Sequence, residues 1–347
     1  MPSNQSPLGA LPARFRRERV LIVGCGDVGM RVAGLMGGAG LAADRAKLAA
    51  AATPVASGPV TASPRVGNSR PRLLALTSTP ARLPSLRASG ITPLVGNLDD
   101  AATLSRLAGL ATRVVHLAPP PSDGQVQWWR DPRSLALARA LRMRTPPRSL
   151  VYGSTSGVYG DCAGARITEA RPVAPLTPRA QRRVDAERIM RHFGRATGAR
   201  VSLLRIPGIY APDRPGGTPR DRLLRGTPVL RPEDDVYTNH VHADDLARVV
   251  VAALWRGRPQ RAIHASDDSE MLMGAYFDFA ADLYGLPRPP RVPRDAARDQ
   301  LPLMLLSFMS ESRRLDNQRL KSELRVLLRY PTVREGLAAA PRPPRSD

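Results

Sequence analysis

A short apolar segment followed at once by three spaced glycines constrains this chain more than any other feature. Residues 20–23 read Val-Leu-Ile-Val, a continuous apolar run typical of a strand buried on both faces of a parallel sheet. Gly24, Gly26 and Gly29 follow, and apolar residues then recur at helical spacing. A glycine pattern between a strand and a helix predicts a dinucleotide-binding turn, with a plain glycine turn as the alternative.

Each glycine has an expected part in such a turn. Gly24 allows the tight turn, Gly26 lets a pyrophosphate approach the backbone, and Gly29 lets helix and strand pack closely. The free N–H groups of the helix N-terminus favour the phosphates. The predicted binding residues of this turn are Gly24, Cys25, Gly26, Asp27, Val28 and Gly29. The Cys25 thiol lies where a helix N-terminus lowers thiol pKa values, or it packs beside the cofactor.

Composition excludes several classes of protein. The chain has no run of 18 apolar residues, so no membrane span is expected. Four arginines precede the first strand without an apolar segment, which argues against a secretory signal. Two cysteines, Cys25 and Cys162, are too few for a disulfide framework and fit a reducing cytoplasm. The net charge of +22 comes almost entirely from dispersed arginines, and with only 4% aromatic residues we expect no specific nucleic-acid partner. The oligomeric state stays open.

The chain beyond the glycines alternates between strands and helices. Strands are expected at 72–77, 91–95, 113–117, 149–152 and 201–205, and helices at 99–110, 128–144 and 177–197. This order predicts an α/β fold: a doubly wound parallel (Rossmann) sheet with a smaller C-terminal substrate-side region. Residues 1–18 are expected to be a flexible N-terminus. The dinucleotide-binding domain would span 19–206, with an insertion at about 41–71 that lacks periodicity. Residues 207–340 would form mainly the substrate side and return elements to the sheet.

The end of the second strand bears on the choice between NAD and NADP. An acid that holds the ribose is expected about 20 residues after the glycines, and Asp44 falls there, but in Ala-rich helical sequence. The strand at 72–77 ends instead in Thr77 and Ser78, with Arg82 close behind and no acid. A small polar end and an arginine favour a 2′-phosphate, so we predict NADP, with NAD as the alternative. Arg82 as a solvated helix residue is the competing interpretation.

Several segments, in order, resemble the extended short-chain dehydrogenase/reductase superfamily, the NAD-dependent epimerase/dehydratase group. Residues 151–161 read VYGSTSGVYGD, similar to the family's Ser/Thr-rich strand end followed by Val-Tyr-Gly. Residues 204–210 (LRIPGIY) and 239–247 (NHVHADDLA) resemble two further family segments, and 314–317 with 330–332 resemble its C-terminal signature. The resemblance covers roughly residues 19–340 apart from the insertion. It implies an oxidoreductase or epimerase/dehydratase acting on a small polar substrate, such as a sugar nucleotide or carbonyl compound.

The resemblance also implies positions around a cofactor and a substrate. Asn97 and Leu98 fall where the family contacts adenine, and Leu117, Ala118 and Pro119 would lie along the cofactor. Thr155 would be the hydroxyl that binds substrate. The family's catalytic Tyr and Lys correspond to Arg179 and Arg183, and arginine does not exchange protons near neutral pH. Arg183 would still hydrogen-bond the ribose, whereas Arg179 would supply fixed positive charge.

Any turnover would then need another acid or base. Tyr159 and Tyr210 are the candidates, and packing in the Val-Tyr-Gly turn is the competing role for Tyr159. The alternative to an enzyme is a non-catalytic NADP(H)-binding sensor or regulatory protein. His240 and His242 near Asp244 and Asp245 resemble metal ligands, but a third ligand at a characteristic spacing is lacking, so no metal is predicted. The aspartates would instead cap a helix.

Overall fold

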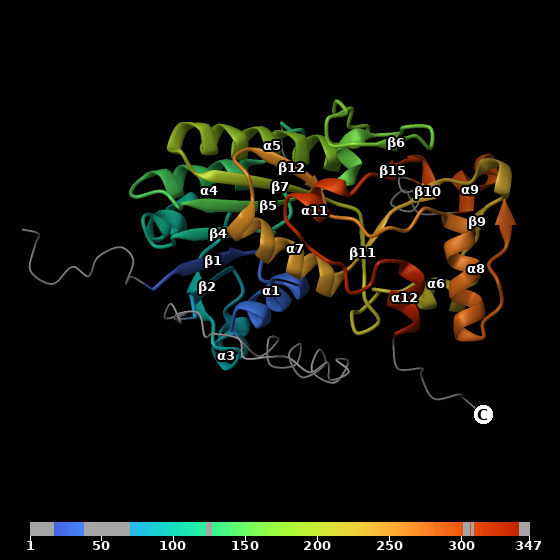
Figure 1. Ribbon diagram of the computed structural model, residues 1–347, viewed down its shortest axis with the longest axis horizontal. Helices are drawn as coiled ribbons and strands as arrows, with labels where there is room; N and C mark the ends of the chain where they lie inside the picture. The colour runs from blue at the N-terminus through green and yellow to red at the C-terminus, as the bar shows by residue number, and fades with distance from the viewer. Residues whose placement is uncertain (1–16, 38–69, 123–126, 301–305, 307–308, 340–347) are drawn as a thin grey trace, which may run out of the picture.

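The computed structural model describes residues 17–37, 70–122, 127–300, 306 and 309–339. Seven parallel strands form the central sheet in the order β12-β7-β5-β4-β1-β2-β3 (Figure 1). Their bounds are β1 Arg19–Val23, β2 Arg72–Thr77, β3 Thr92–Val95, β4 Arg113–His116, β5 Ser149–Thr155, β7 Arg200–Ile206 and β12 Arg261–His264. The predicted doubly wound Rossmann fold is therefore confirmed.

The strand order reverses at β1, which pairs with β2 on one side and β4 on the other. Open parallel sheets bind ligands at the carboxyl ends of the strands beside such a switch point. The glycines follow β1 directly, so the chain turns from strand into helix at this place. The seventh strand, β12, pairs with β7, and no strand was predicted at its residues.

Alternate residues of β1 pack into two apolar clusters, one on each face of the sheet. Val20 and Ile22 belong to one apolar cluster, and Leu21 and Val23 to the other. The first cluster is completed by helices α1 (Asp27–Gly37) and α7 (Ala243–Arg256), which pack against each other (Figure 1). Helices α4 (Pro132–Arg142) and α5 (Pro178–Thr197) complete the second cluster. Because residues 20–23 of β1 are all buried, the apolar run is explained by coverage of both faces of the sheet.

Three predicted elements differ from the structure in helix type or by three or more residues at one end. Residues expected as a helix at 99–110 form instead a 3-10 helix, η3, over Ala101–Leu107, capped by the Asp100 side chain. Helix α4 begins at Pro132 rather than at 128, because the residue before a proline is disfavoured in helical conformation and Asp131 serves as its N-cap. Strand β5 continues to Thr155, three residues beyond the predicted end.

The prediction of a flexible N-terminus falls largely outside the described residues, which begin at Arg17. Glu18, within the predicted flexible stretch, is held in place: its carbonyl accepts a hydrogen bond from the amide of Arg72. The predicted insertion also lies mostly outside, and so does Asp44. Its described ends are close together, since Arg70 donates to the carbonyl of Gly37 over 3.0 Å.

The C-terminal half adds short elements around a third apolar cluster. Strand β8 (Gly208–Tyr210) pairs in parallel with β11 (His240–His242), and α7 follows directly. The remaining elements are η2 Pro80–Arg82, α3 Leu83–Ala88, η4 Ser156–Tyr159, β6 Arg166–Ile167, α6 Arg220–Leu224, β9 Val229–Leu230, η5 Pro232–Asp234, β10 Tyr237–Thr238, β13 Met271–Leu272, α8 Met273–Tyr284, β14 Arg291–Val292, α9 Arg294–Gln300, β15 Arg314–Leu315, α11 Gln318–Ser322 and α12 Val333–Ala338. Helices α6, α8, α9 and α12 gather to the right of the sheet in Figure 1. None of the described helices is long and apolar enough to cross a membrane.

Candidate functional site: the glycine turn and the carboxyl ends of the strands

Gly24 makes the turn that closes β1. Its φ is +88°, a left-handed conformation that favours glycine. A Cβ at this position would lie 2.3 Å from the backbone N of Ala118, so β4's extension passes directly against the turn. The amides of Leu117 and Ala118 both donate to the carbonyl of Val23, which holds this close approach.

Gly26 and Gly29 differ in what surrounds them. A Cβ on Gly26 would meet no described atom within 4 Å, as expected where a ligand approaches the backbone. A Cβ on Gly29 would lie 2.8 Å from the carbonyl oxygen of Gly24 and 3.3 Å from Ile22, so only glycine lets α1 pack this closely on the turn. The three glycines have the environments that the dinucleotide-binding pattern requires.

The helix behind the turn is held by a cluster of charges that the sequence did not indicate. Arg31 donates to the carboxylates of Asp27 over 3.0 Å and Asp213 over 2.8 Å, and it also pairs with Asp244. Arg214 lies 3.5 Å from the second oxygen of Asp27. The two arginines face three carboxylates, so they hold Asp27 in place without neutralising the whole cluster.

Cys25 does not have the reactive character considered above. The residue is buried, its sulfur lies 3.6 Å from that of Met30, and burial raises the pKa of the thiol more than Arg82 lowers it. Half-buried Val28 packs against the same apolar cluster. Cys25 therefore packs under the turn, and its carbonyl accepts a hydrogen bond from Arg82 over 2.6 Å.

This hydrogen bond places the Arg82 guanidinium beside the glycine turn, next to the end of β2. Thr77 is buried and accepts from the amide of Thr79, and Ser78 is exposed. Among the described residues, the segment from Thr77 to Arg82 carries no acid. Half-buried Arg82 is thus not a freely solvated helix residue.

The segments that follow β3 and β4 lie at the carboxyl ends of these strands. Asn97 is exposed and its side chain accepts from the amide of Asp99, while Leu98 packs on the second apolar cluster. Leu117 and Ala118 are half-buried beside Gly24, and the carbonyl of exposed Pro119 accepts from Arg133. A salt bridge of 2.6 Å between Arg133 and Asp99 joins the two segments.

Helix α5 brings its first turns to the carboxyl end of β5. Half-buried Thr155 accepts a hydrogen bond from the amide of Gly157, at the start of η4. Arg183 is 8% exposed and donates to the carbonyl of Gly153 over 2.6 Å and to the Tyr152 hydroxyl over 3.1 Å. Arg179, one turn earlier, is exposed on the helix surface, where partial burial and Arg183 lower the pKa of its guanidinium.

A chain of three buried polar residues, Asp131, Ser134 and His116, lies near Arg183. Ser134 donates to Asp131 over 2.6 Å, so the contact of 3.0 Å between Ser134 and His116 has the imidazole Nε2–H as donor. Burial and the Arg183 charge lower the pKa of His116 to about 3, which keeps the ring neutral. Asp131 and Ser134 form a local pair at the start of α4, but His116 and Arg183 approach this pair only when β4, α4 and α5 pack.

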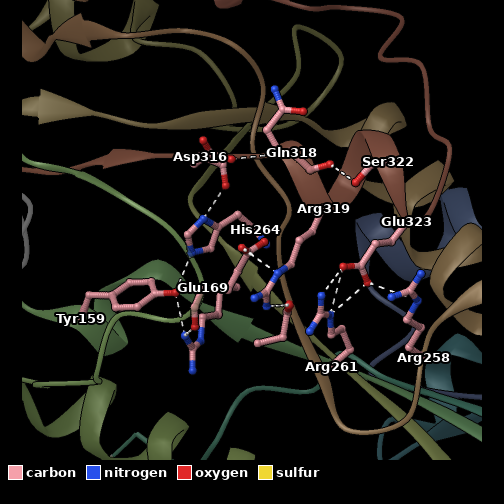
Figure 2. A network of polar contacts seen from close by, with 12 residues as sticks. Tyr159, Glu169, Arg258, Arg261, His264, Asp316, Gln318, Arg319, Ser322 and Glu323 are labelled. Atoms are coloured by element: carbon pink, nitrogen blue, oxygen red, sulfur yellow. Dashed lines mark hydrogen bonds and ion pairs between the residues drawn. The ribbon is translucent and has the colours of Figure 1, made fainter.

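Tyr159 lies in the packed interior, which contradicts its prediction as an acid or base acting on substrate. The side chain is 1% exposed, and its hydroxyl lies 2.5 Å from His264 Nε2 (Figure 2). The same hydroxyl lies 2.6 Å from Arg205. His264 Nδ1 must donate to the Asp316 carbonyl, so Nε2 accepts from the tyrosine. Burial raises the pKa of Tyr159 to about 12, so the packing role of Tyr159 holds instead.

The residues weighed as metal ligands serve structural purposes. The N-cap of α7 is His242, whose Nδ1 accepts from the amide of Asp244, so the prediction that the aspartates cap this helix was wrong. Asp245 is fully buried and accepts from the amides of Arg329 and Tyr330. Tyr210, the other predicted acid or base, is buried with its ring edge-on to His242, and its hydroxyl donates to the Thr332 carbonyl, which contradicts that prediction as well. In the described parts of the chain, no group of three or more His, Cys, Asp or Glu side chains is placed to hold a metal.

A sequence match that extends over more than half of the chain identifies its family. The pattern of the NAD dependent epimerase/dehydratase family matches residues 72–265, which is more than half of the chain. The chain belongs to this family. The resemblance stated from the sequence is therefore confirmed. The matched residues include β2 to α5, whereas β1, the glycine turn and α1 precede them.

Individual relatives agree with the family assignment. A UDP-glucose 4-epimerase from Azospirillum brasilense is 30% identical over 134 residues, which are 39% of this chain and only 33% of that enzyme. A functionally unknown conserved protein from Silicibacter pomeroyi has 26% identity and a TM-score of 0.68, covering 93% of this chain and 97% of its own. The dTDP-glucose 4,6-dehydratase DesIV from Streptomyces venezuelae, solved with NAD, has 21% identity and a TM-score of 0.67, covering 92% and 94%. At that identity the likeness shows the fold alone.

Proposed function

We propose that the protein binds a nicotinamide dinucleotide at residues 24–29 and acts as an oxidoreductase or epimerase/dehydratase on a small polar substrate. The observation that carries the proposal is the open backbone at Gly26, set between the close contacts of Gly24 and Gly29. A pyrophosphate would accept hydrogen bonds from the N–H groups at the start of α1. When bound, the cofactor supplies hydride acceptance and donation.

We further propose that NADP(H) is preferred over NAD(H). The support is the absence of an acid between Thr77 and Arg82, together with the Arg82 guanidinium held beside the turn. Carboxylates select a free ribose 2′-hydroxyl, whereas arginine accommodates a 2′-phosphate. Several solved relatives contain bound NAD, among them a UDP-glucuronic acid 4-epimerase from Bacillus cereus with 16% identity and a TM-score of 0.65. A sugar nucleotide is the substrate class that such relatives suggest for this chain.

In the proposed site, Thr155 hydrogen-bonds the substrate at the carboxyl end of β5. Arg183 fixes the end of that strand through the Gly153 carbonyl, and Arg179 supplies positive charge to the substrate. Neither guanidinium takes or gives a proton near neutral pH. This loss of the Tyr–Lys pair also favours the second candidate, a non-catalytic sensor that keeps the fold and the cofactor.

Titration with NADPH and NADH, followed by cofactor fluorescence, tests the proposal. We expect saturable binding of NADPH, with weaker binding of NADH. A clear preference for NADH would refute the choice of NADP, and no binding of either would refute the dinucleotide site. Hydride transfer to a panel of carbonyl compounds and sugar nucleotides then separates the enzyme from the sensor.

A further inference from the structure

The first two turns of α5 carry three arginines, and one of them, Arg179, lies in the first turn, where a helix disfavours cations. Arg179, Arg182 and Arg183 follow the N-cap Thr177, and the first turn contains no acidic residue. The N-terminus of a helix has a partial positive charge, so cations there are unfavourable. Arg179 and Arg183 stand four residues apart on one face, which adds repulsion between like charges.

No carboxylate in the described chain forms an ion pair with these three side chains. Arg182 is 9% exposed and donates to the carbonyls of Trp128 and Ser122, and Arg183 donates to a carbonyl and a hydroxyl. The Nε atoms of both are buried without a hydrogen-bond partner. Buried guanidinium groups usually have a carboxylate partner or lose stability.

The nearest acids are engaged with other groups. Asp131 accepts from the amide and hydroxyl of Ser134, and Asp185 accepts from the amide of Asp131. Glu187, one turn beyond Arg183, pairs with Arg205 over 2.9 Å and with Arg191 over 3.3 Å. The positive charge at the start of α5 is therefore not matched by a dedicated acid.

This charge lies at the place where a substrate would react. Arg183 reaches the Gly153 carbonyl, two residues before Thr155, and η4 packs against the first turns of α5. Ligands of open parallel sheets bind at such carboxyl ends. An anion beside exposed Arg179 would be stabilised by this guanidinium, by the charge of Arg183 behind it and by the helix N-terminus together.

We propose that Arg179 and Arg183 bind an anionic group of the substrate, a carboxylate or a phosphate, at the carboxyl end of β5. This inference rests on the proposed function, because it assigns the substrate class of that site. The arginine pair thus takes the place of a proton-transfer pair and positions an acidic substrate by charge. Arg179 makes direct contact with the anion, and Arg183 contributes charge from its buried position.

Binding of inorganic phosphate and of oxalate tests the inference. Thermal melting of the full chain is followed against each anion, at constant ionic strength set with KCl, with and without saturating NADPH. We expect a saturable rise of Tm with at least one of the two anions. The Arg179→Gln variant should weaken the apparent affinity by about tenfold or more, and Arg179→Lys should restore part of it.

Arg188→Gln is the matched control, because Arg188 is an exposed arginine on the same helix. Its anion affinity should equal that of the parent. The inference is overturned if neither anion acts beyond KCl, or if Arg188→Gln weakens binding as much as Arg179→Gln. It is also overturned if saturating NADPH abolishes the Arg179-dependent rise of Tm with anion, because the anion would then occupy the phosphate site of the cofactor. An anion effect that persists while NADPH fails to bind supports this site and refutes the dinucleotide proposal alone.

Discussion

Gly26 is a position where a substitution should weaken ligand binding and leave folding unchanged. A side chain there meets no described atom within 4 Å, so the Gly26→Val variant should fold as the parent does. The same side chain would occupy the space through which a pyrophosphate reaches the backbone. We expect NADPH affinity to fall by about a hundredfold or more, because several charge-assisted hydrogen bonds are lost together. Fluorescence titration measures the affinity, and thermal melting checks the fold.

Gly34→Val is the control for this change, since Gly34 lies in the same helix and its Cβ would also meet nothing within 4 Å. It should leave cofactor affinity unchanged. Gly24→Ala should behave differently from both, because a φ of +88° and a contact of 2.3 Å oppose any side chain. It should destabilise the protein by more than about 1 kcal/mol. Equal NADPH affinity in Gly26→Val and the parent would show that the site is misplaced.

Arg82 is the residue that should set the preference for NADP. Replacing it with alanine removes the cation beside the glycine turn, so NADPH affinity should fall by about tenfold or more. NADH, which has no 2′-phosphate, should lose little. Arg87→Ala, a change of an exposed arginine on the following helix, should affect neither. Parallel losses for both cofactors in Arg82→Ala would mean that Arg82 only supports the turn through the Cys25 carbonyl.

At the scale of elements, the junction of β5 and α5 carries the proposed chemistry. Once an activity is found, Thr155→Ala should lower kcat/KM by about tenfold to a hundredfold, since a substrate hydrogen bond is removed. Arg179→Ala should raise KM and leave the pH profile unchanged, because arginine stays protonated throughout the accessible range. Steady-state kinetics from pH 6 to 9 measures both. Full activity in Thr155→Ala, or a shifted profile in Arg179→Ala, would rule out these assignments.

The elements that sequence reasoning found are those with a local signal. The apolar run of β1 and the glycines of the turn belong to one continuous segment, and the predicted bounds of β2 agree with the structure. Strand β12 escaped prediction because Arg261–His264 is short and pairs with β7, some 60 residues earlier. The role of Tyr159 depended likewise on His264, which comes from this unpredicted strand.

The contacts of charged residues likewise depend on the packing of elements that are far apart in the sequence. Asp44 and Arg82 were weighed by their position in the chain, but the contact of Arg82 with the Cys25 carbonyl exists only after β2 pairs with β1. The sequence shows that the first turns of α5 contain three arginines. It does not show whether they have acidic partners, because ion pairs such as that of Arg205 with Glu187 join different elements.

At the scale of the whole molecule, the segment between α1 and β2 offers a test of what the fold requires. Residues 44–69 lie outside the described structure, but Arg70 donates to the carbonyl of Gly37, so the flanking ends are close. Replacing 44–69 with a short Gly/Ser linker should leave Tm and NADPH affinity nearly unchanged. Thermal melting and titration check this expectation. A large drop in either would show that the segment packs on the domain.

The buried histidines make the whole molecule sensitive to acid. Burial lowers the pKa of His116 to about 3, and those of His240 and His264 to about 4, from the usual 6.5. A folded-state pKa below the unfolded one means that the unfolded chain binds more protons in between, so these groups lose stability as pH falls from 6.5 toward 4. Buried carboxyls with raised pKa values act in the opposite direction: Asp131, Glu169, Asp235 and Asp267.

A difference between variants isolates one histidine from these opposing groups. His264 accepts from the Tyr159 hydroxyl and lies near Arg205 and Arg319, whose charges also oppose its protonation. His264→Gln should be less stable than the parent at pH 7.5, and this deficit should shrink by about 2 to 4 kcal/mol as pH falls from 6.5 to 4. Urea unfolding at a series of pH values measures it, with exposed His192→Gln as the control. A deficit that stays constant over this range would mean that His264 takes up a proton as readily in the folded protein as in the unfolded chain, and that the acid sensitivity originates elsewhere.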